Sequence, residues 1–167
     1  MKKFIKEIYS YVLIVVFVIL FRSYIATPVR VDGDSMNDTL INNDILILNK
    51  MDKKYERFDI VVINYNNTKL VKRIIGLPGE NIEYKDNTLY INDKEYKDIE
   101  TSRTKDFSIK ELYEVEKIPE DTYFVMGDNR NNSLDSRDYR VGFINKEDIV
   151  GVTVFRIYPF NSIGSVK

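Results

Sequence analysis

The hydrophobic pattern of the chain begins with one long apolar run, from Ile8 to Ala26, which contains a single charged residue, Arg22. As an α-helix, these 19 residues would extend about 28 Å, close to the thickness of a bilayer core. Three lysines within the first six residues precede the run, and such a bias favours a cytoplasmic N-terminus. The pattern predicts a single transmembrane helix, with residues 1–27 as cytoplasmic N-terminus and anchor.

A cleavable signal peptide has the same layout, with basic residues before an apolar core. Its cleavage site has small residues one and three positions before the cut. A cut after Ala26 would place Tyr24 at the outer position, and a cut after Ser23 would place Phe21 there. The sequence therefore favours a retained anchor over a cleaved leader.

Beyond Pro28 the apolar residues come in short runs, separated by Asn, Asp and Lys. Ser108 followed by Glu111 is a capping pattern that predicts one short helix through Tyr113. The fold class expected for residues 28–167 is mainly β, an antiparallel domain on the single N-terminal helix. The predicted strands are 45–48, 60–63, 70–75, 123–126 and 150–157, with a small hairpin over 84–96.

Composition narrows the chemistry that this domain can perform. The 25 basic and 26 acidic residues nearly cancel, which argues against a nucleic-acid partner. The chain has no cysteine and no histidine, so a disulfide framework, a thiolate metal site and a Ser-His-Asp triad are all excluded. Acid–base chemistry near neutral pH must then use Lys, Tyr, Asp or Glu with a shifted pKa. No cofactor is indicated.

Ser35 lies in the stretch Gly33-Asp34-Ser35-Met36, nine residues beyond Ala26. Even fully extended, nine residues span at most about 30 Å, so Ser35 is tethered close to the predicted membrane segment. Glycine two residues before the serine allows a sharp turn and a close approach of a substrate strand. An ordinary surface turn has the same composition.

Lys72 lies in the predicted strand 70–75, where alternation places it on the same face as Leu70 and Ile74. One interpretation is an amphipathic lysine whose ammonium reaches solvent at the rim of the sheet. The other is a desolvated lysine that serves as a base, because burial can lower a lysine pKa by about 3–5 units.

The segment 127–137 is polar and follows a predicted strand, so it is not itself a core strand. A calcium loop is excluded, because Arg130 and Ser133 stand where an oxygen ligand and a glycine are needed. Two interpretations remain, an exposed Asn-rich turn and a buried polar network. In the second, Asp128 and Asp135 alternate with two arginines, so the segment could satisfy its own charges.

Taken together, three segments resemble the conserved boxes of bacterial type I signal peptidases, in the family's order. They are Ser35-Met36, Lys72-Arg73 with Gly76-Leu77-Pro78-Gly79, and Gly127-Asp128-Asn129-Arg130 to Asp135-Ser136-Arg137. The resemblance implies a Ser-Lys dyad protease that removes signal peptides from exported proteins at the outer face of the bacterial cell membrane. The single membrane segment is similar to the compact Gram-positive form.

The resemblance also implies roles for individual residues. Ser35 corresponds to the nucleophile, Lys72 to the general base and Ser133 to the hydroxyl that orients the lysine. Backbone N–H groups, including that of Ser35, would hold the oxyanion. The remaining supporting residues are Met36 beside the nucleophile and an ion network of Asp128, Arg73, Asp135 and Arg137.

Three positions depart from the family pattern. Asp38 stands where Pro is usual, which leaves the rigidity of the turn after Ser35 in question. Asn131 stands where Asp is usual, and Phe58 replaces a usual Gly. None of the three removes the dyad.

The expected partners are preproteins that bear signal peptides, the lipid bilayer and the protein export machinery. One alternative is a self-cleaving Ser-Lys peptidase of the repressor type, against which the anchor argues. The other is an inactive, membrane-anchored β domain that binds peptides or acts as a secretion scaffold. The retained dyad argues against this scaffold.

Overall fold

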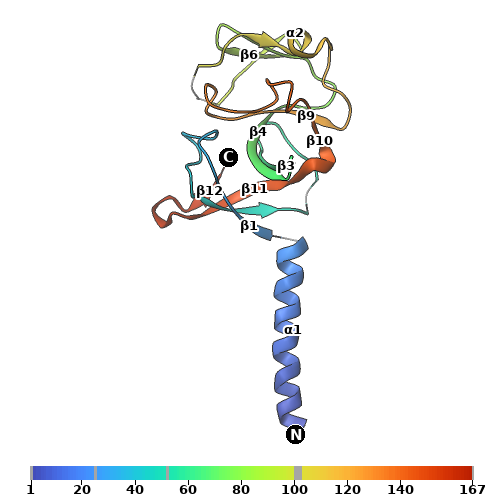
Figure 1. Ribbon diagram of the computed structural model, residues 1–167, viewed down its shortest axis with the longest axis vertical. Coiled ribbons are helices and arrows are strands. Elements are labelled where there is room, and N and C mark those ends of the chain that lie inside the picture. Colours follow the sequence, from blue (N-terminus) through green and yellow to red (C-terminus); the bar gives the residue numbers. More distant parts are fainter. Residues whose placement is uncertain (1, 25, 52, 100–102, 167) are drawn as a thin grey trace.

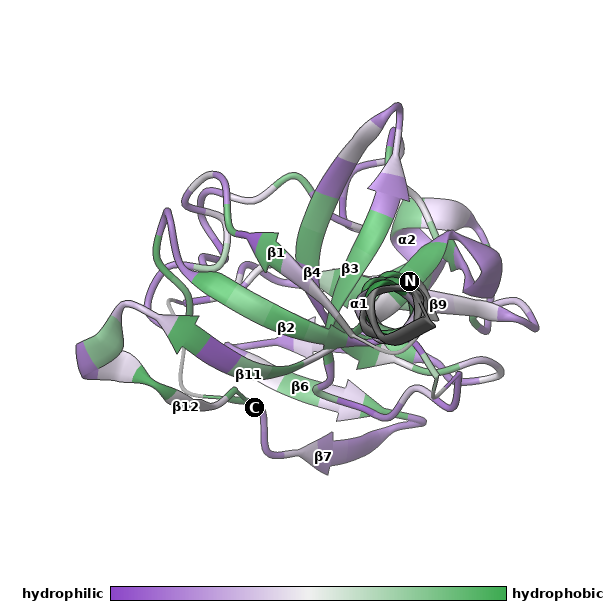
Figure 2. Cartoon of the chain, turned by 90° about the horizontal axis from the view of Figure 1, so that it is seen from below, coloured by the Kyte–Doolittle hydropathy of each residue, from purple (hydrophilic) through white to green (hydrophobic). Residues whose placement is uncertain are grey.

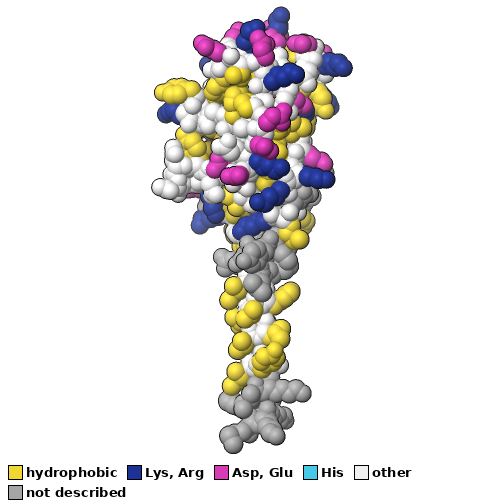
Figure 3. Space-filling model, turned by 90° about the vertical axis from the view of Figure 1, so that its right-hand side faces the viewer, with side chains coloured by type: hydrophobic (Ala, Val, Ile, Leu, Met, Phe, Trp, Pro, Cys, Tyr) yellow, Lys and Arg dark blue, Asp and Glu magenta, His cyan; other side chains and the backbone are white. Residues whose placement is uncertain are grey.

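The computed structural model describes residues 2–24, 26–51, 53–99 and 103–166. Side chains are described for residues 8–19 and for all residues of these ranges from 27 onward. Helix α1 (Lys2–Tyr24) projects from a β-rich body, and its apolar side chains between Ile8 and Ile19 are 47% to 70% exposed (Figures 1 and 3). Within that described part, no helix combines the length and the apolar character needed to cross a membrane. The C-terminal end of the predicted span, residues 20–26 with Arg22, lies outside the described side chains.

The larger sheet has eight strands, all paired antiparallel, in the order β1-β2-β11-β3-β4-β9-β10, with β12 on β11. The strands are β1 (Ala26–Arg30), β2 (Ile45–Asn49), β3 (Ile60–Tyr65), β4 (Thr68–Gly76), β9 (Thr122–Met126), β10 (Ile144–Asn145), β11 (Ile149–Tyr158) and β12 (Gly164–Ser165). The 3₁₀ turns η1 (Lys146–Asp148) and η2 (Phe160–Ser162) flank β11. The predicted strands and the antiparallel β class are confirmed.

The predicted hairpin over 84–96 is part of a second sheet of four strands, in the order β7-β6-β5-β8. These are β5 (Ile82–Lys85), β6 (Thr88–Ile91), β7 (Lys94–Tyr96) and β8 (Phe107–Ser108). The predicted short helix is α2 (Ile109–Tyr113), and its N-cap Ser108 accepts a hydrogen bond from the Glu111 N–H. This sheet lies at the end of the body away from α1 (Figure 1).

The predicted extension of the first helix to Ala26 is wrong, because α1 ends at Tyr24 and Ala26 begins β1. Pro28 explains the change, since proline biases the preceding residue to extended backbone. Proline also lacks an N–H, which a strand at the edge of a sheet tolerates, and β1 is at such an edge. The expected division between residues 27 and 28 therefore falls inside a strand.

Three apolar clusters form the core. One fills the space between the two sheets and includes Ile75, Phe124 and Tyr84, and a second centres on Val61 and Val125 of the larger sheet. The third lies beneath the turn that follows β1, and its buried members are Val31, Met36, Leu40, Leu46, Ile60 and Val166. In Figure 2 the central strands of the larger sheet are mostly hydrophobic, whereas β7 and the outer loops are hydrophilic.

Gly151 marks the closest approach of two strands. A Cβ at this position would lie 2.5 Å from the backbone oxygen of Asn49, and backbone of a neighbouring strand cannot move aside easily. The register of β11 against β3 also shifts between Ile149 and Gly151. β11 joins β2 to β3, so this approach helps to fix the frame that carries the site.

We expect Gly151→Ala to lower the free energy of unfolding by about 1–3 kcal/mol, because the added methyl group overpacks the strand contact. Gly164→Ala is the matched control, since nothing lies within 4 Å of the added atom there. Urea denaturation of both variants measures the difference. Equal stability of the two variants would contradict the close approach.

Candidate active site

The structure brings Ser35 and Lys72 into direct contact, with Lys72 Nζ 2.6 Å from Ser35 Oγ. Ser35 lies in the turn between β1 and β2, and Lys72 lies in β4, 37 residues later. Lys72 is only 2% exposed, and its strand β4 lies inside the sheet between β3 and β9. Of the two interpretations of Lys72, the structure supports the buried amine and not the lysine at the rim.

Burial lowers the pKa of the Lys72 ammonium from 10.5 to about 8. The carboxylates of Asp135 and Asp128 act in the opposite direction, and the Arg137 guanidinium lowers the pKa further. At a pKa near 8, roughly one molecule in ten carries the neutral amine at pH 7, against roughly one in 2,500 for a free lysine. The amine can therefore accept a proton under ordinary conditions.

The turn that carries Ser35 is held from the side by the segment that follows β9. The Asn129 N–H donates to Ser35 O at 3.0 Å, and the Asn129 side chain donates to Asp34 O at 3.1 Å. A Cβ at Gly127 would lie 2.4 Å from Ser35 O and 2.2 Å from Ser133 Oγ. Only glycine at position 127 leaves room for these two serines to flank it.

Ser133 lies beside the dyad, but it forms no hydrogen bond to Lys72. Its Oγ is buried and, among the described residues, has no hydrogen-bond partner. Met36, the residue after Ser35, is 1% exposed and packs into the apolar cluster beneath the turn. Both residues therefore lie where the family resemblance implies, although the lysine contact of Ser133 is not formed.

Two arginine–carboxylate pairs, one fully buried and one partly buried, surround Ser35 and Lys72. Arg73 donates from Nε and Nη2 to the two oxygens of Asp128 at 2.9 and 2.7 Å, and its Nη1 donates to Phe58 O. Arg137 donates to both oxygens of Asp135 at 2.9 and 2.8 Å, and the Gly127 N–H donates to Asp135 as well. Although burial alone would raise the pKa of Asp135, Arg137 and the Gly127 N–H hold it below its ordinary value.

Much of the segment 127–137 is a buried polar network, although Asn131, Asn132 and Leu134 are exposed. It satisfies its own charges only in part, because Asp135 pairs with Arg137 inside the segment whereas the other charged residues do not. Asp128 pairs with Arg73 of β4, outside the segment. Arg130 lies 2.8 Å from Asp98 and donates to the Tyr84 hydroxyl at 2.8 Å and to Thr104 at 2.9 Å. These partners lie too far along the chain for a sequence pattern to reveal them.

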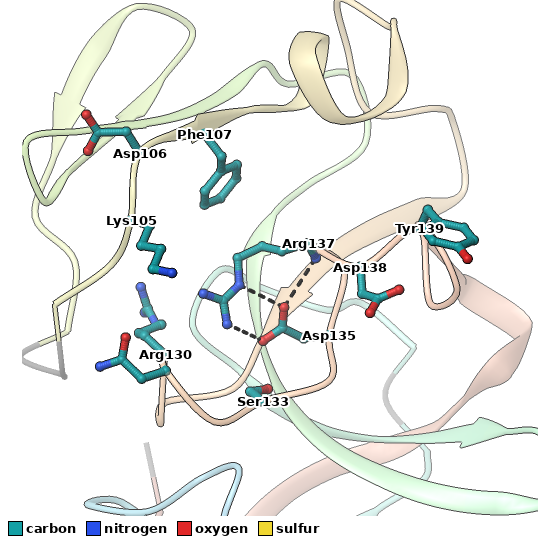
Figure 4. Close-up of a pocket in the computed structure, with 10 residues that line it drawn as sticks. Lys105, Asp106, Phe107, Arg130, Ser133, Asp135, Arg137, Asp138 and Tyr139 are labelled. Atoms are coloured by element: carbon teal, nitrogen blue, oxygen red, sulfur yellow. Dashed lines mark hydrogen bonds and ion pairs between the residues drawn. The ribbon is translucent and has the colours of Figure 1, made fainter.

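A cavity of about 510 Å³ opens between β8 and the segment that follows β9. Figure 4 shows Lys105, Arg130 and Arg137 pointing into this space, with Ser133 at its edge. The exposed residue Asn131 also lines it, so the change from the family's usual Asp faces solvent. Neither member of the dyad is among the described lining residues.

The other two departures from the family pattern have left-handed backbone. Asp38 has φ 84° and Phe58 has φ 70°. Proline cannot adopt a positive φ, so the turn after Ser35 follows a path that excludes proline at position 38. Phe58 occupies a conformation that favours glycine, which accounts for the family's usual residue there.

The match to one protein family decides the identity. The model of the signal peptidase family, peptidase S26, matches residues 2–158. The chain belongs to this family. It is therefore a serine peptidase of the signal peptidase type, which favours the enzyme over the inactive scaffold.

Individual relatives agree with this membership. Signal peptidase I S of Bacillus subtilis (strain 168) is 42% identical over 162 residues, which cover 91% of this chain and 88% of the relative. Signal peptidase I T of the same strain is 39% identical over 167 residues, which cover 93% of this chain and 86% of the relative. A crystal structure of a signal peptidase I from Enterococcus faecalis V583 is 38% identical, with a TM-score of 0.54. It covers 59% of this chain and 96% of the solved one.

We expect Asp38→Pro to destabilise the protein by about 1–3 kcal/mol, because the ring cannot reach φ 84°. Asp38→Gly is the matched control, since glycine adopts this backbone freely. Thermal unfolding of the two variants makes the comparison. A proline variant as stable as the glycine variant would contradict the left-handed turn.

Proposed function

We propose that Ser35 is the nucleophile and Lys72 the general base of a membrane-anchored endopeptidase that removes signal peptides from exported preproteins. The observation that carries this proposal is the 2.6 Å contact between Lys72 Nζ and Ser35 Oγ at a lysine that is 2% exposed. A nucleophile within hydrogen-bond reach of an activated base is the signature of covalent catalysis.

The reaction begins with the neutral amine of Lys72. Nζ takes the proton from Ser35 Oγ while Oγ forms a bond to the scissile carbonyl carbon. The Lys72 ammonium then protonates the nitrogen of the leaving peptide as the C–N bond breaks, which leaves an acyl-enzyme on Ser35. Lys72 next takes a proton from water while the water oxygen forms a bond to the acyl carbon. The C–Oγ bond then breaks, and the Lys72 ammonium returns the proton to Ser35 Oγ.

The oxyanion of the tetrahedral intermediate requires N–H donors that are not already used. In the described contacts, the Ser35 N–H donates to no acceptor, so it can serve. The Gly33 N–H donates to the Asn42 side chain at 3.3 Å and is less available. Glycine at position 33 supplies no side-chain donor, so any second donor comes from elsewhere in the site.

The two arginine pairs have an electrostatic role in this scheme. The carboxylates of Asp128 and Asp135 would favour the charged form of Lys72 if they stood alone. Arg137 offsets them in part, and so helps to preserve the lowered pKa of Lys72. Ser133, buried without a partner, is positioned to orient the amine or the incoming substrate during turnover.

Residues 1–27 are the proposed cytoplasmic N-terminus and anchor, with residues 28–167 on the outer side of the bacterial membrane. Three observations support this arrangement: the lysines at the N-terminus, the exposed apolar side chains of α1, and an apolar rim. The rim consists of Phe155, Phe160 and Ile163 around the β11–β12 turn, at the end of the body from which α1 projects (Figure 1). The bilayer and the export machinery are the proposed partners.

Ser35→Ala and Lys72→Met are each expected to reduce cleavage of a preprotein with an Ala-x-Ala site by more than about 10³-fold. Nucleophile and base act together, so the loss of either one removes most of the catalysis. The assay uses detergent-solubilised full-length chain. Arg140→Gln is the control, since Arg140 pairs with Asp138 on the surface. Cleavage that survives Lys72→Met would contradict the proposed base.

Lys72→Met is also expected to stabilise the fold at neutral pH, by about 1–3 kcal/mol. The pKa of Lys72 is about 8 in the folded chain and 10.5 in the unfolded chain, so the buried ammonium destabilises the fold. This destabilisation is fully present below pH 8, and it disappears as the pH rises from 8 to 10.5. Urea denaturation at pH 7 and pH 10 measures this cost, and the gain should shrink at the higher pH. A destabilised variant at pH 7 would indicate that Lys72 is not desolvated.

The value of kcat/KM is expected to rise with pH through a midpoint near 8, because only the neutral amine accepts the serine proton. The profile is measured between pH 6 and pH 10 with the same preprotein. A profile that keeps rising beyond pH 10 would show that the essential base is an ordinary lysine.

A further inference from the structure

The turn from Ser35 to Asp44 has little support of its own. Within it, the Thr39 and Leu40 N–H groups donate to Met36 O, and the Asp44 N–H donates to Ile41 O. Asp38 has a φ of 84°, so proline cannot stiffen the turn at this position. Something outside the turn must therefore hold the backbone on which Ser35 sits.

Arg156 of β11 supplies such support. Its Nη1 donates to Thr39 O at 3.2 Å and to Asp44 Oδ2 at 2.8 Å. Asp44 is 1% exposed, and the same oxygen accepts the Ile41 N–H. One guanidinium thus ties both the middle and the end of the turn to a strand that lies more than 110 residues further along the chain.

The C-terminal hairpin completes the attachment. Arg156 Nε donates to Ser162 O at 2.9 Å, which fixes the guanidinium to the β11–β12 connection. Val166, just beyond β12, is buried in the same apolar cluster as Met36 and Leu40 of the turn. The turn is therefore held by a buried ion pair on one side and by apolar packing from the C-terminus on the other.

We infer that Arg156 is a positioning residue for catalysis, and that the β11–β12 hairpin holds the turn from Ser35 to Asp44 in place. The inference rests on the proposed role of Ser35 as nucleophile. Arg156 does not touch Ser35 or Lys72 in the described contacts, so it acts through Thr39 and Asp44. These contacts of Arg156 and the β11–β12 hairpin, which we call the brace, set the distance between Ser35 Oγ and Lys72 Nζ.

A displaced nucleophile affects the chemical step more than it affects peptide binding. Misplacement of about 1 Å can cost about 100-fold in rate. Arg156→Gln is therefore expected to lower kcat about 10- to 100-fold with KM changed less than about 3-fold. Arg156→Lys, which keeps the charge near Asp44, is expected to recover part of this loss.

Loss of Arg156 alone also leaves the buried Asp44 carboxylate without its cation, which can destabilise the fold. The double variant Arg156→Gln/Asp44→Asn removes both charges and avoids this effect. Its kcat is expected to match that of Arg156→Gln, because both act on one contact. Arg140→Gln, which breaks a surface arginine–aspartate pair, is the matched control and should keep full kcat.

Hydrogen–deuterium exchange locates the effect. In Arg156→Gln, exchange should increase at the amides of residues 36–44, while β3, β4 and β9 stay protected. Unchanged kcat and exchange in a folded Arg156→Gln protein would overturn the brace. So would a loss of protection spread over the whole domain, because it would indicate a purely structural residue. If Ser35→Ala also kept its activity, the proposed nucleophile would fail separately.

Discussion

The burial of one amine is the constraint on which the rest of this structure depends. Lys72 lies inside the larger sheet with its Nζ on Ser35 Oγ, and a charged amine in that place is costly. This cost lowers the pKa of Lys72 to about 8, which is what the proposed role of general base requires. Any change that admits water to Lys72, or frees a nearby carboxylate, weakens the catalyst even if the dyad stays in contact.

The segment 127–137 surrounds the buried amine and connects three parts of the fold. Asp128 reaches Arg73 on the strand of the lysine, and Asn129 holds the backbone of Ser35. Arg130 reaches the second sheet through Asp98 and Tyr84. The network therefore orders the site and neutralises its charges at once. Removing one partner of a buried ion pair typically costs about 3–5 kcal/mol, so the Arg73–Asp128 pair is also a large part of the stability.

Local patterns in the sequence predicted most of the long strands and the Ser108 cap, whereas the family resemblance singled out Ser35 and Lys72 as the proposed dyad. They did not predict β8, β10 and β12, because two residues carry no periodicity. They also missed the pairing of Arg130 with Asp98 and of Arg156 with Asp44, since partners so distant in sequence are brought together only by the fold. The left-handed backbone at Asp38 and Phe58 was likewise hidden, although both positions stood out as departures from the family.

The most direct test is an NMR titration of the Lys72 side chain in protein labelled with ¹³C at the lysine Cε. The resonance of Lys72 is identified by its absence from the spectrum of Lys72→Met. A midpoint near pH 8, well below the ordinary value of 10.5, is the predicted result. A Lys72 resonance that titrates together with the surface lysines would contradict the account, because the amine would then be protonated whenever the enzyme works.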